Sequence, residues 1–480
     1  MLNLVNRSPG NRRDGIIVRI TSRRERFMYD SVIQGGLVAD PEANSLIVEN
    51  IGIKDGKIVY KGKEPVDGKV VIDAGGLVVA PGFIDIHGHV DGHDYCGELS
   101  ALQGITTTVG GNCGMGPHEL DAFFNRQDEK GFIINQAQLI GHSFTLRKAA
   151  GIEDPFAPAT KKQIEMMTRL AARALDEGAC GISLGLEYAP GSSYEELLAL
   201  ARLAANYKRL LPIHTRADSS EGHPSLEEAL SLSRDTGCRV VISHFVYQYG
   251  YEGTEAALDR MDRAVYEGLD VYIDSGMYTQ WATFIGTAVF NEGFILENQE
   301  ILKDMMAATG PYRGQRLNVE LYLKMRAQCP MDTVIHLTGN EEEVFRILKK
   351  SYAMPSSDTL PYGRGEGHPQ SAGSFPRFFR RMVRERGDLG LLEAVKKASL
   401  LPATVLGLKT KGRLAPGNDG DLVVFNIQSL RDRADFPDRG MPDAPPEGIE
   451  HVLVNGVPAV SYGKLQSVRP GRSVRFMSSE

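Results

Sequence analysis

Between about residues 77 and 406, short apolar runs alternate with longer segments whose apolar residues recur at helical spacing. Short runs of this kind favour buried strands, and apolar residues three and four positions apart favour amphipathic helices. Eight strands alternating with helices fit an α/β fold, a (β/α)8 barrel of the TIM type, which needs about 250 residues. The predicted strands are residues 77–86, 106–110, 132–140, 181–185, 211–214, 239–244, 269–274 and 354–358. The clearest helical patterns cover residues 164–177, 194–207, 226–236 and 254–267.

Both ends of the chain carry shorter strand patterns, and neither end could form a domain alone. We expect residues 28–76 and 407–480 to form one small β-sandwich domain beside the barrel at 77–406. The interval between the seventh and eighth strands is too long for an ordinary connection, so residues 279–352 are predicted to hold an extra helical lid over the barrel mouth. Residues 1–27 are rich in arginine but lack the apolar segment of a secretory signal, and we expect a disordered tail there.

The overall composition excludes several classes of protein. A chain of 480 residues exceeds one compact core, and its 42% hydrophobic and 24% charged residues are typical of globular proteins. A net charge of −7 offers no basic field for nucleic acid or a membrane surface, and no apolar run could cross a bilayer. Five cysteines without framework spacing favour a reducing, cytoplasmic compartment. The expected partner is a small-molecule substrate, and the oligomeric state does not follow from the sequence.

Metal-ligand residue types stand at the ends of five predicted strands. Two histidines close the first strand, where residues i and i+2 point to one face. A cysteine follows the second strand in the run Gly111-Asn112-Cys113-Gly114. Because a barrel places its active site at the carboxyl ends of its strands, these side chains should meet at one mouth. The six candidates are His87, His89, Cys113, His214, His244 and Asp358.

Each candidate has an ordinary structural explanation when it is considered alone. Cys113 could be a small buried hydrophobe. Each histidine could be a core residue with satisfied hydrogen bonds, and Asp358 could be a turn or cap residue. Only the occurrence of the whole set at five separate strand ends favours a chemical role.

The chemistry of zinc suits this set of side chains. Zinc binds imidazole and thiolate ligands, and a catalytic zinc keeps one position for water. Cys113, His214 and His244 make such a three-ligand site. The two histidines of the first strand, with Asp358, either hold a second, weaker metal or line the water. A bound metal lowers the pKa of water and polarises a carbonyl, and Asp358 is the predicted general base that passes the water proton to the leaving nitrogen.

Several motifs together resemble the D-aminoacylase (N-acyl-D-amino-acid deacylase) branch of the amidohydrolase superfamily, over about residues 31–476. The matching segments are 81–89, 111–114, 183–191, 242–244, 357–358, 375–377 and 412–425. The resemblance implies a zinc-dependent hydrolase that cleaves the amide of an N-acyl-D-amino acid. It also implies that the three-ligand set holds the tight zinc, that Cys113 can bridge to a second site at His87 and His89, and that Asp358 is the base.

The same resemblance implies two substrate contacts. Arg377 matches a residue that pairs with the substrate α-carboxylate, which suits a planar guanidinium. Tyr188 matches a residue that lines the pocket. The alternatives are a solvated arginine on the lid and a packed aromatic side chain.

Two positions depart from the family pattern in the region of the substrate. Val246 stands where the family usually carries lysine, and Gly276 opens a Gly-Met-Tyr run where the family usually has Tyr-Pro-Tyr. We therefore weigh a zinc amidohydrolase for a linear N-acyl-D-amino acid or close relative against an enzyme of the same fold for a cyclic amide, an imide or another N-acyl compound without the carboxylate. A non-catalytic metal-binding protein would lack a ligand or the base, and neither is missing.

Overall fold

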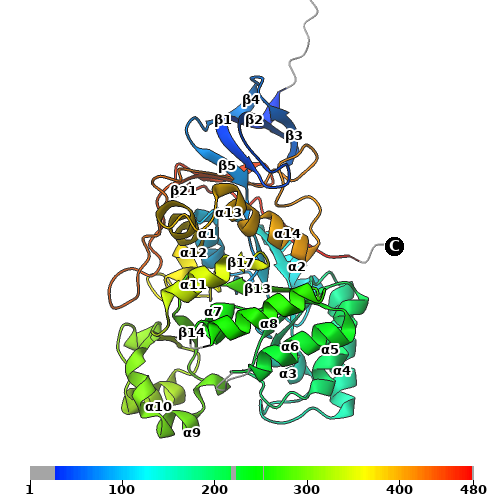
Figure 1. Cartoon of the computed structure of the whole chain (residues 1–480), viewed down its shortest axis with the longest axis vertical. Helices are drawn as coiled ribbons and strands as arrows, with labels where there is room; N and C mark the ends of the chain where they lie inside the picture. Colours follow the sequence, from blue (N-terminus) through cyan, green and yellow to red (C-terminus); the bar gives the residue numbers. More distant parts are fainter. Residues whose placement is uncertain (1–27, 218–222, 252, 478–480) are drawn as a thin grey trace, which may run out of the picture.

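The computed structural model describes residues 28–217, 223–251 and 253–477. Figure 1 shows a β-sheet at one end of the molecule and a larger α/β part below it. The tail predicted at residues 1–27 lies outside the described residues. No helix in the described ranges combines the length and the apolar character that crossing a membrane would require.

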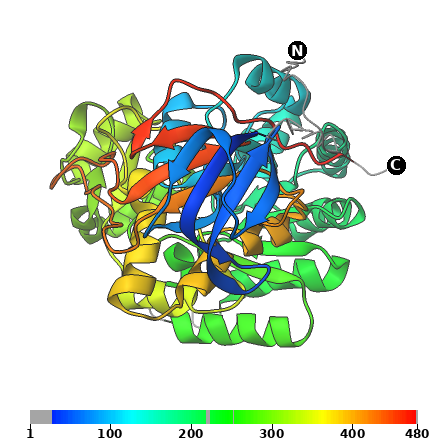
Figure 2. The same ribbon diagram turned by 90° about the horizontal axis from the view of Figure 1, so that it is seen from above.

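The β-sheet at one end of the molecule, here called the terminal sheet, joins both ends of the chain. Its nine strands form one hydrogen-bonded sheet in which β5 lies between β1 and β18, parallel to β1 and antiparallel to β18. Figure 2 shows the early strands in blue beside the late strands in orange and red. The strands are β1 (Tyr29–Asp40), β2 (Ser45–Lys54), β3 (Lys57–Gly62), β4 (Gly68–Asp73), β5 (Val78–Pro81), β18 (Leu422–Phe425), β19 (Ile449–Val454), β20 (Val457–Ser461) and β21 (Lys464–Leu465).

The strand predicted at residues 77–86 is in fact two strands with different partners. β5 pairs within the terminal sheet, whereas β6 (Phe83–Asp85) pairs with β7 in the larger part. The chain crosses between the two at Gly82, where a Cβ atom would overlap the side chain of Thr106. Glycine is therefore required at this crossing, and it connects the terminal sheet directly to the first strand below the site.

The larger part contains parallel strands that follow one another in chain order. One run is β6-β7-β8 and the other is β9-β10-β11-β12-β13-β17. The two runs are continuous, because β8 and β9 are one strand interrupted at Leu139. The amide of Leu139 donates to the carbonyl of Gly110 on the β7 side (3.0 Å), and the amide of Ile140 donates to the carbonyl of Gly181 on the β10 side (3.1 Å). The strands are β6 (Phe83–Asp85), β7 (Ile105–Gly110), β8 (Asn135–Gln138), β9 (Ile140–Gly141), β10 (Ile182–Gly185), β11 (Leu210–His214), β12 (Arg239–Ile242), β13 (Val271–Ser275) and β17 (Ala353–Pro355).

The last parallel strand is linked back to the first just beyond their carboxyl ends. The amide of Asp358 donates to the carbonyl of His87 (2.8 Å), and the amide of His89 donates to the carbonyl of Thr359 (2.7 Å). The strand order is therefore cyclic, as a (β/α)8 barrel requires. The expected eighth strand at 354–358 ends earlier, at Pro355, and leaves Asp358 in the following loop.

Helices separate the parallel strands and cover them on the outside (Figure 1). Several begin at the caps that the sequence supplies: Thr160 and Gln163 form a capping box on α4, and the Ser193 side chain caps α5. The main helices are α1 (Asp94–Leu102), α2 (Leu120–Lys130), α4 (Lys161–Asp176), α5 (Tyr194–Asn206), α6 (Pro224–Thr236), α8 (Thr254–Tyr266), α11 (Glu341–Leu348), α12 (Gln370–Phe378), α13 (Leu391–Ala398) and α14 (Leu400–Leu406).

The sequence predicted a helical segment between β13 and β17, but the structure shows strands there as well as helices. It contains an antiparallel sheet in the order β14-β16-β15, together with the three α-helices α9, α10 and α11. Each of these strands has only three or four residues, so their alternation is too brief to stand out in the sequence. The elements are β14 (Trp281–Phe284), α9 (Glu292–Glu297), β15 (Met305–Ala307), α10 (Val319–Gln328) and β16 (Thr333–His336).

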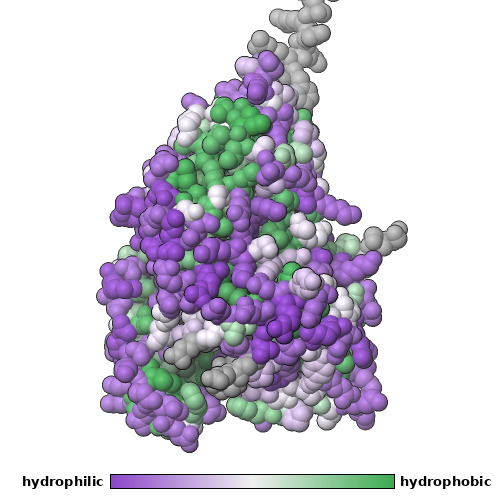
Figure 3. All heavy atoms as spheres, in the orientation of Figure 1, coloured by the Kyte–Doolittle hydropathy of each residue, from purple (hydrophilic) through white to green (hydrophobic). Residues whose placement is uncertain are grey.

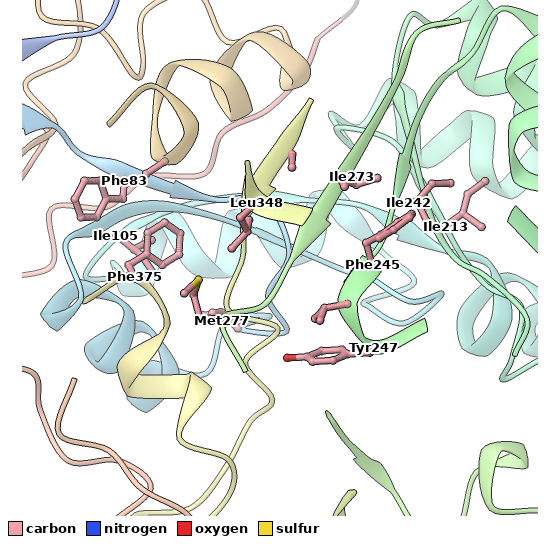
Figure 4. Close-up of a cluster of buried hydrophobic side chains, with 14 of the residues drawn as sticks. Phe83, Ile105, Ile213, Ile242, Phe245, Tyr247, Ile273, Met277, Leu348 and Phe375 are labelled. Atoms are coloured by element: carbon pink, nitrogen blue, oxygen red, sulfur yellow. The ribbon is translucent and has the colours of Figure 1, made fainter. Parts of the chain in front are cut away.

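The core lies between the parallel strands and their helices. Figure 4 shows Phe83 and Phe375 grouped together; their rings are stacked with centroids 5.7 Å apart, at the junction with the terminal sheet. Figure 3 shows an apolar area on the terminal sheet, whose strands β2 and β4 carry exposed apolar residues such as Val48 and Val71.

Candidate metal centre

The structure brings all six predicted ligands and base residues to one end of the parallel strands. Each stands at or just after a strand end, as predicted, although β6 stops at Asp85 and leaves His87 and His89 in the loop that follows. The two rings nevertheless stay close, with centroids 5.5 Å apart. Their Nε2 atoms lie 3.4 and 3.3 Å from Oδ1 of Asp358.

One cluster contains a thiolate and two imidazoles. Nδ1 of His214 lies 2.8 Å from Nε2 of His244, and Sγ of Cys113 lies 3.6 Å from the same Nε2. All three ligand atoms lie within 4.8 Å of one another, and the three residues are buried. Tetrahedral zinc with about 2.0 Å bonds to nitrogen and about 2.3 Å bonds to sulfur separates its ligand atoms by about 3.3–3.5 Å, so the sulfur is well spaced and the two nitrogens would move apart by about 0.5 Å. The side chains therefore fit a zinc ion.

A second cluster shares Cys113 with the first. It comprises His87, His89 and Cys113, and the Sγ of Cys113 lies 3.3 Å from Nε2 of His87. A single thiolate between two pairs of imidazoles can bridge two metal ions. The imidazole Nδ1 atoms of His89 and His244 have no hydrogen-bond partner within the described residues.

The surroundings of Cys113 favour its thiolate. Burial alone would raise the pKa of the thiol, but the charge of His87 and the hydrogen bonds of His214 and His244 outweigh it and hold the pKa well below its usual range. His214 shows the reciprocal effect: burial lowers its pKa, but Cys113 and Glu187 raise it to about 9. A metal ion binding here would displace protons from these groups.

Two carboxylates, the half-buried Glu187 and the buried Asp274, fix the outer nitrogens of two imidazoles, and sequence reasoning missed both. Oε2 of Glu187 lies 2.8 Å from Nε2 of His214, and Oδ2 of Asp274 lies 3.1 Å from Nδ1 of His87. Carboxylates in these positions set the tautomer so that the opposite nitrogen faces the metal. Asp274 is the second-to-last residue of β13 (Val271–Ser275), so the strand-end argument that found the ligands would have found it too.

Asp274 also connects the two clusters. Its Oδ1 accepts hydrogen bonds from the backbone amide of His244 (2.9 Å) and from the hydroxyl of Ser356 (2.7 Å). The carboxylate is therefore bonded to one residue of each cluster and to the loop that carries Asp358.

Three of the site residues adopt a left-handed backbone conformation. The φ angles are 54° at Cys113, 34° at His244 and 47° at Asp358. Non-glycine residues rarely adopt such angles, and they persist only where the surroundings enforce them. The sharp turns after three strands aim these side chains at a common point.

The base candidate is buried and ionised. Burial opposes the charge on Asp358, but hydrogen bonds from His87 and His89 outweigh it, so the pKa of this carboxyl lies well below its usual range. Its main-chain carbonyl accepts a hydrogen bond from Nε2 of Gln370. Asp358 is thus held through its side chain and through its main-chain carbonyl.

The clusters open into a cavity of about 240 Å³. Tyr188, expected in this pocket, does line it: its ring lies 4.7 Å from that of His214, and its hydroxyl lies 2.9 Å from that of Thr283. Trp281 and Thr283 of β14 line the same cavity, so the segment between β13 and β17 forms one of its walls.

Arg377 does not line this pocket in the structure, and its contact with the substrate α-carboxylate stays a prediction. Its guanidinium bonds to the Glu341 carboxylate, to Asp432 (3.3 Å) and to the carbonyl of Met277 (3.1 Å). It lines a separate, polar pocket on the surface beyond residues 277–280. The two carboxylates are shared, because Glu341 also pairs with Arg381 and Asp432 also pairs with Arg380.

Comparison with known proteins agrees with this geometry. The amidohydrolase family model matches residues 70–208 and 336–460. An N-acyl-D-glutamate deacylase of Alcaligenes xylosoxydans xylosoxydans is 35% identical over 415 residues, which is 79% of this chain and 82% of the relative. A D-aminoacylase of the same organism is 29% identical over 391 residues, 74% of this chain and 78% of that protein.

A solved structure resembles the whole fold. It is the N-acyl-D-glutamate deacylase from Bordetella bronchiseptica complexed with zinc and a phosphonate inhibitor, a mimic of the tetrahedral intermediate. Its sequence is 31% identical, the TM-score is 0.83, and the match covers 93% of this chain and 100% of that one. With the family model, the relatives and the metal-ligand cluster in agreement, the chain belongs to the amidohydrolase family.

Proposed function

We propose that this protein is a zinc-dependent amidohydrolase that cleaves the amide bond of an N-acyl-D-amino acid or a close relative. The observation that carries the proposal is the shared thiolate of Cys113 between two imidazole clusters, with the carboxylate of Asp358 3.3 Å from the nearer imidazole. The names of the relatives, an N-acyl-D-glutamate deacylase and a D-aminoacylase, support the substrate class.

The residues of the site have separate roles in the proposed hydrolysis. Cys113, His214 and His244 would hold the tight zinc, and His87 and His89 would hold a second ion with Cys113. A zinc ion bound there supplies a Lewis acid for the carbonyl and lowers the pKa of water.

Asp358 performs the proton transfers in this scheme. Its ionised carboxylate accepts the proton of the attacking water and returns it to the nitrogen that leaves. The walls formed by Tyr188 and β14 shield the reaction from bulk water.

We also propose a division of the chain into parts with separate tasks. Residues 28–76 and 407–480 form the small β domain, residues 77–406 form the barrel, and 279–352 act as a lid over its mouth. The pairing of β5 with β18 and the position of Trp281 in the cavity wall support this division. The five cysteines are all free, which suits a reducing compartment such as the cytoplasm.

A substrate panel tests the proposed activity. Zinc-loaded protein is offered N-acetyl- and N-formyl-D-amino acids and their L enantiomers, and release of free amine is measured. We expect turnover of D compounds in preference to L compounds. Absence of deacylation across the panel, with zinc bound, would contradict the proposal.

A variant separates the role of the base from that of the metal. Asp358→Asn should abolish turnover while zinc content stays near that of the wild type, because the three-ligand cluster does not include this residue. Cys113→Ser is the matched comparison, which should lose zinc as well as activity. Persistent activity in Asp358→Asn would reassign the base.

A further inference from the structure

The thiolate of Cys113 has the most demanding position in the metal centre, because both imidazole clusters share it. Its Sγ atom lies 3.3 Å from Nε2 of His87 and 3.6 Å from Nε2 of His244. A rotation of the turn that carries Cys113 would bring the sulfur closer to one cluster and move it away from the other. The residues that fix this turn therefore decide whether one thiolate can serve two metal ions.

The turn that carries Cys113 needs support from outside. Cys113 has a left-handed φ of 54°, a conformation that non-glycine residues adopt rarely and at a cost in free energy. The amide of Met115 donates to the carbonyl of Asn112 at 3.0 Å and closes the turn from within. Further constraints come from the neighbouring strands.

Ser183 of β10 spans this turn with a single hydroxyl group. The hydroxyl accepts a hydrogen bond from the amide of Gly114 at 3.0 Å and donates one to the carbonyl of Gly111. These two backbone groups stand on either side of Cys113, so the hydroxyl fixes the turn both before and after the ligand. Ser183 is fully buried, and water therefore does not compete for these bonds.

The alternation of β10 explains why the side chain of residue 183 reaches the turn. Ile182 and Leu184 belong to the apolar core that the strands share with the outer helices. Ser183 stands between them and therefore points to the opposite face of the strand, towards the barrel interior. A hydroxyl both donates and accepts, as the two backbone groups of the turn require.

Ser143, just after β9, supports the same turn from a second direction. Its hydroxyl donates to the carbonyl of Gly185 at 2.8 Å and accepts from the amide of Gly185 at 3.0 Å. A Cβ atom on Gly185 would lie 2.1 Å from the carbonyl oxygen of Cys113, and one on Gly114 would lie 2.6 Å from Cβ of Ser143. The turn is therefore in close contact with Ser143 and Gly185 on two sides.

From these contacts we propose, on the basis of the function proposed above, that Ser183 is a positioning residue for the bridging thiolate. Its hydroxyl holds the turn in the orientation that offers Cys113 to both clusters at once. Without this hydroxyl the turn relaxes, and the sulfur follows the ion of the three-ligand cluster at the expense of the cluster with His87 and His89. The second metal ion is therefore the one that depends on Ser183.

Titration with cobalt(II) tests this role, because a thiolate bound to cobalt(II) gives a near-ultraviolet charge-transfer absorption that imidazole ligands do not give. Zinc-free protein is titrated as wild type and as Ser183→Ala. We expect the wild-type absorption to rise over two equivalents, since Cys113 binds both ions. In Ser183→Ala the first rise should remain, and the affinity for the second ion should fall about 10–100-fold, the loss typical of residues that orient a metal ligand.

Two variants separate positioning from general destabilisation. Ser31→Ala is the matched control, because it removes another buried serine hydrogen bond, to the carbonyl of Gly456 at 3.0 Å in the terminal sheet. It should bind both ions as the wild type does. Ser183→Thr keeps the hydroxyl and should recover the affinity for the second ion. Thermal melting reports folding, and if Ser183→Ala does not fold, Ser143→Ala loosens the same turn and should show the same selective loss.

The outcomes distinguish this proposal from the proposed function. Second-ion affinity equal to that of the Ser31→Ala control would overturn the proposal, and so would equal losses at both ions, which a purely structural serine would cause. A folded Ser183→Thr protein as weak as Ser183→Ala would also count against the hydroxyl. Wild-type protein without any thiolate absorption would instead contradict the metal centre on which the proposed function depends, and the proposal would fall with it.

Discussion

Replacing Asp274 by asparagine is expected to weaken metal binding without touching any ligand. The carboxylate receives three hydrogen bonds, from Nδ1 of His87 (3.1 Å), the amide of His244 (2.9 Å) and the hydroxyl of Ser356 (2.7 Å). Asparagine keeps the shape but replaces one acceptor oxygen with an NH2 donor. If that donor faces His87, Nδ1 must give up its proton, and Nε2 then carries the proton and cannot bind metal.

The other orientation of the amide is no better. With the NH2 turned towards the backbone amide of His244, two donors face each other in a fully buried place, which costs about 1–3 kcal/mol. Loss of a carboxylate behind a metal ligand typically weakens binding 10–100-fold, or about 1.4–2.8 kcal/mol. We expect Asp274→Asn to lower zinc affinity within this range, with the larger loss at the second site that contains His87.

The assay is competition for zinc against a chromophoric chelator, with thermal melting of the zinc-free protein as a check on folding. Asp421→Asn is the matched control, because Asp421 is also a buried carboxylate with three donors: Lys411, Asn135 and the amide of Asn455. It should cost stability but not zinc affinity. Zinc binding in Asp274→Asn equal to that of the control would refute the tautomer argument.

Three further predictions concern other parts of the molecule. Gly276→Ala should reduce the free energy of unfolding by about 1–3 kcal/mol in urea titrations because its Cβ would lie 2.5 Å from the Tyr247 hydroxyl. Gly390→Ala, with nothing within 4 Å, should lose less, because only the N-cap preference of α13 for glycine over alanine is affected. Burial lowers the pKa of Lys397 to about 8 from 10.5, so the unfolded chain binds more protons between these values and wild-type stability should rise with pH across them. Lys397→Met should lose that rise, and parallel curves for the two proteins would contradict it. Glu187→Ala should weaken zinc binding 10–100-fold in chelator competition, and Glu187→Gln should weaken it less, because an amide oxygen can still accept from His214; equal losses would argue against the acceptor role.

Much of this site could be predicted because its ligands follow regular strands. His214 ends β11, and His244 and Cys113 come within three residues after β12 and β7. Parallel strands bring their carboxyl ends to one edge of the sheet. Once the strands are predicted from the pattern of apolar residues, the residues at their ends are therefore expected to lie together.

Other features could not be read in the same way because they depend on contacts across the fold. The apolar run that contains β5 and β6 reads as one strand, and only the approach of Thr106 to Gly82 reveals the break. The ion pairs of Arg377 with Glu341 and Asp432 could not be predicted either, because these carboxylates lie far away in the sequence. The hydrogen bond of the Tyr247 hydroxyl likewise has its acceptor, Gln370, 123 positions away.

The terminal sheet also has a consequence for biosynthesis. The hydroxyl of Ser31 bonds to the carbonyl of Gly456, 425 positions later in the chain. At about 5–20 residues per second, a ribosome needs on the order of 20–90 s to deliver the second partner. During that interval β5 has an open edge, and a nascent chain with an unpaired apolar edge is prone to aggregate. Chaperones that shield nascent chains should therefore improve the yield of this protein more than they improve the yield of proteins whose sheets are built from neighbouring strands.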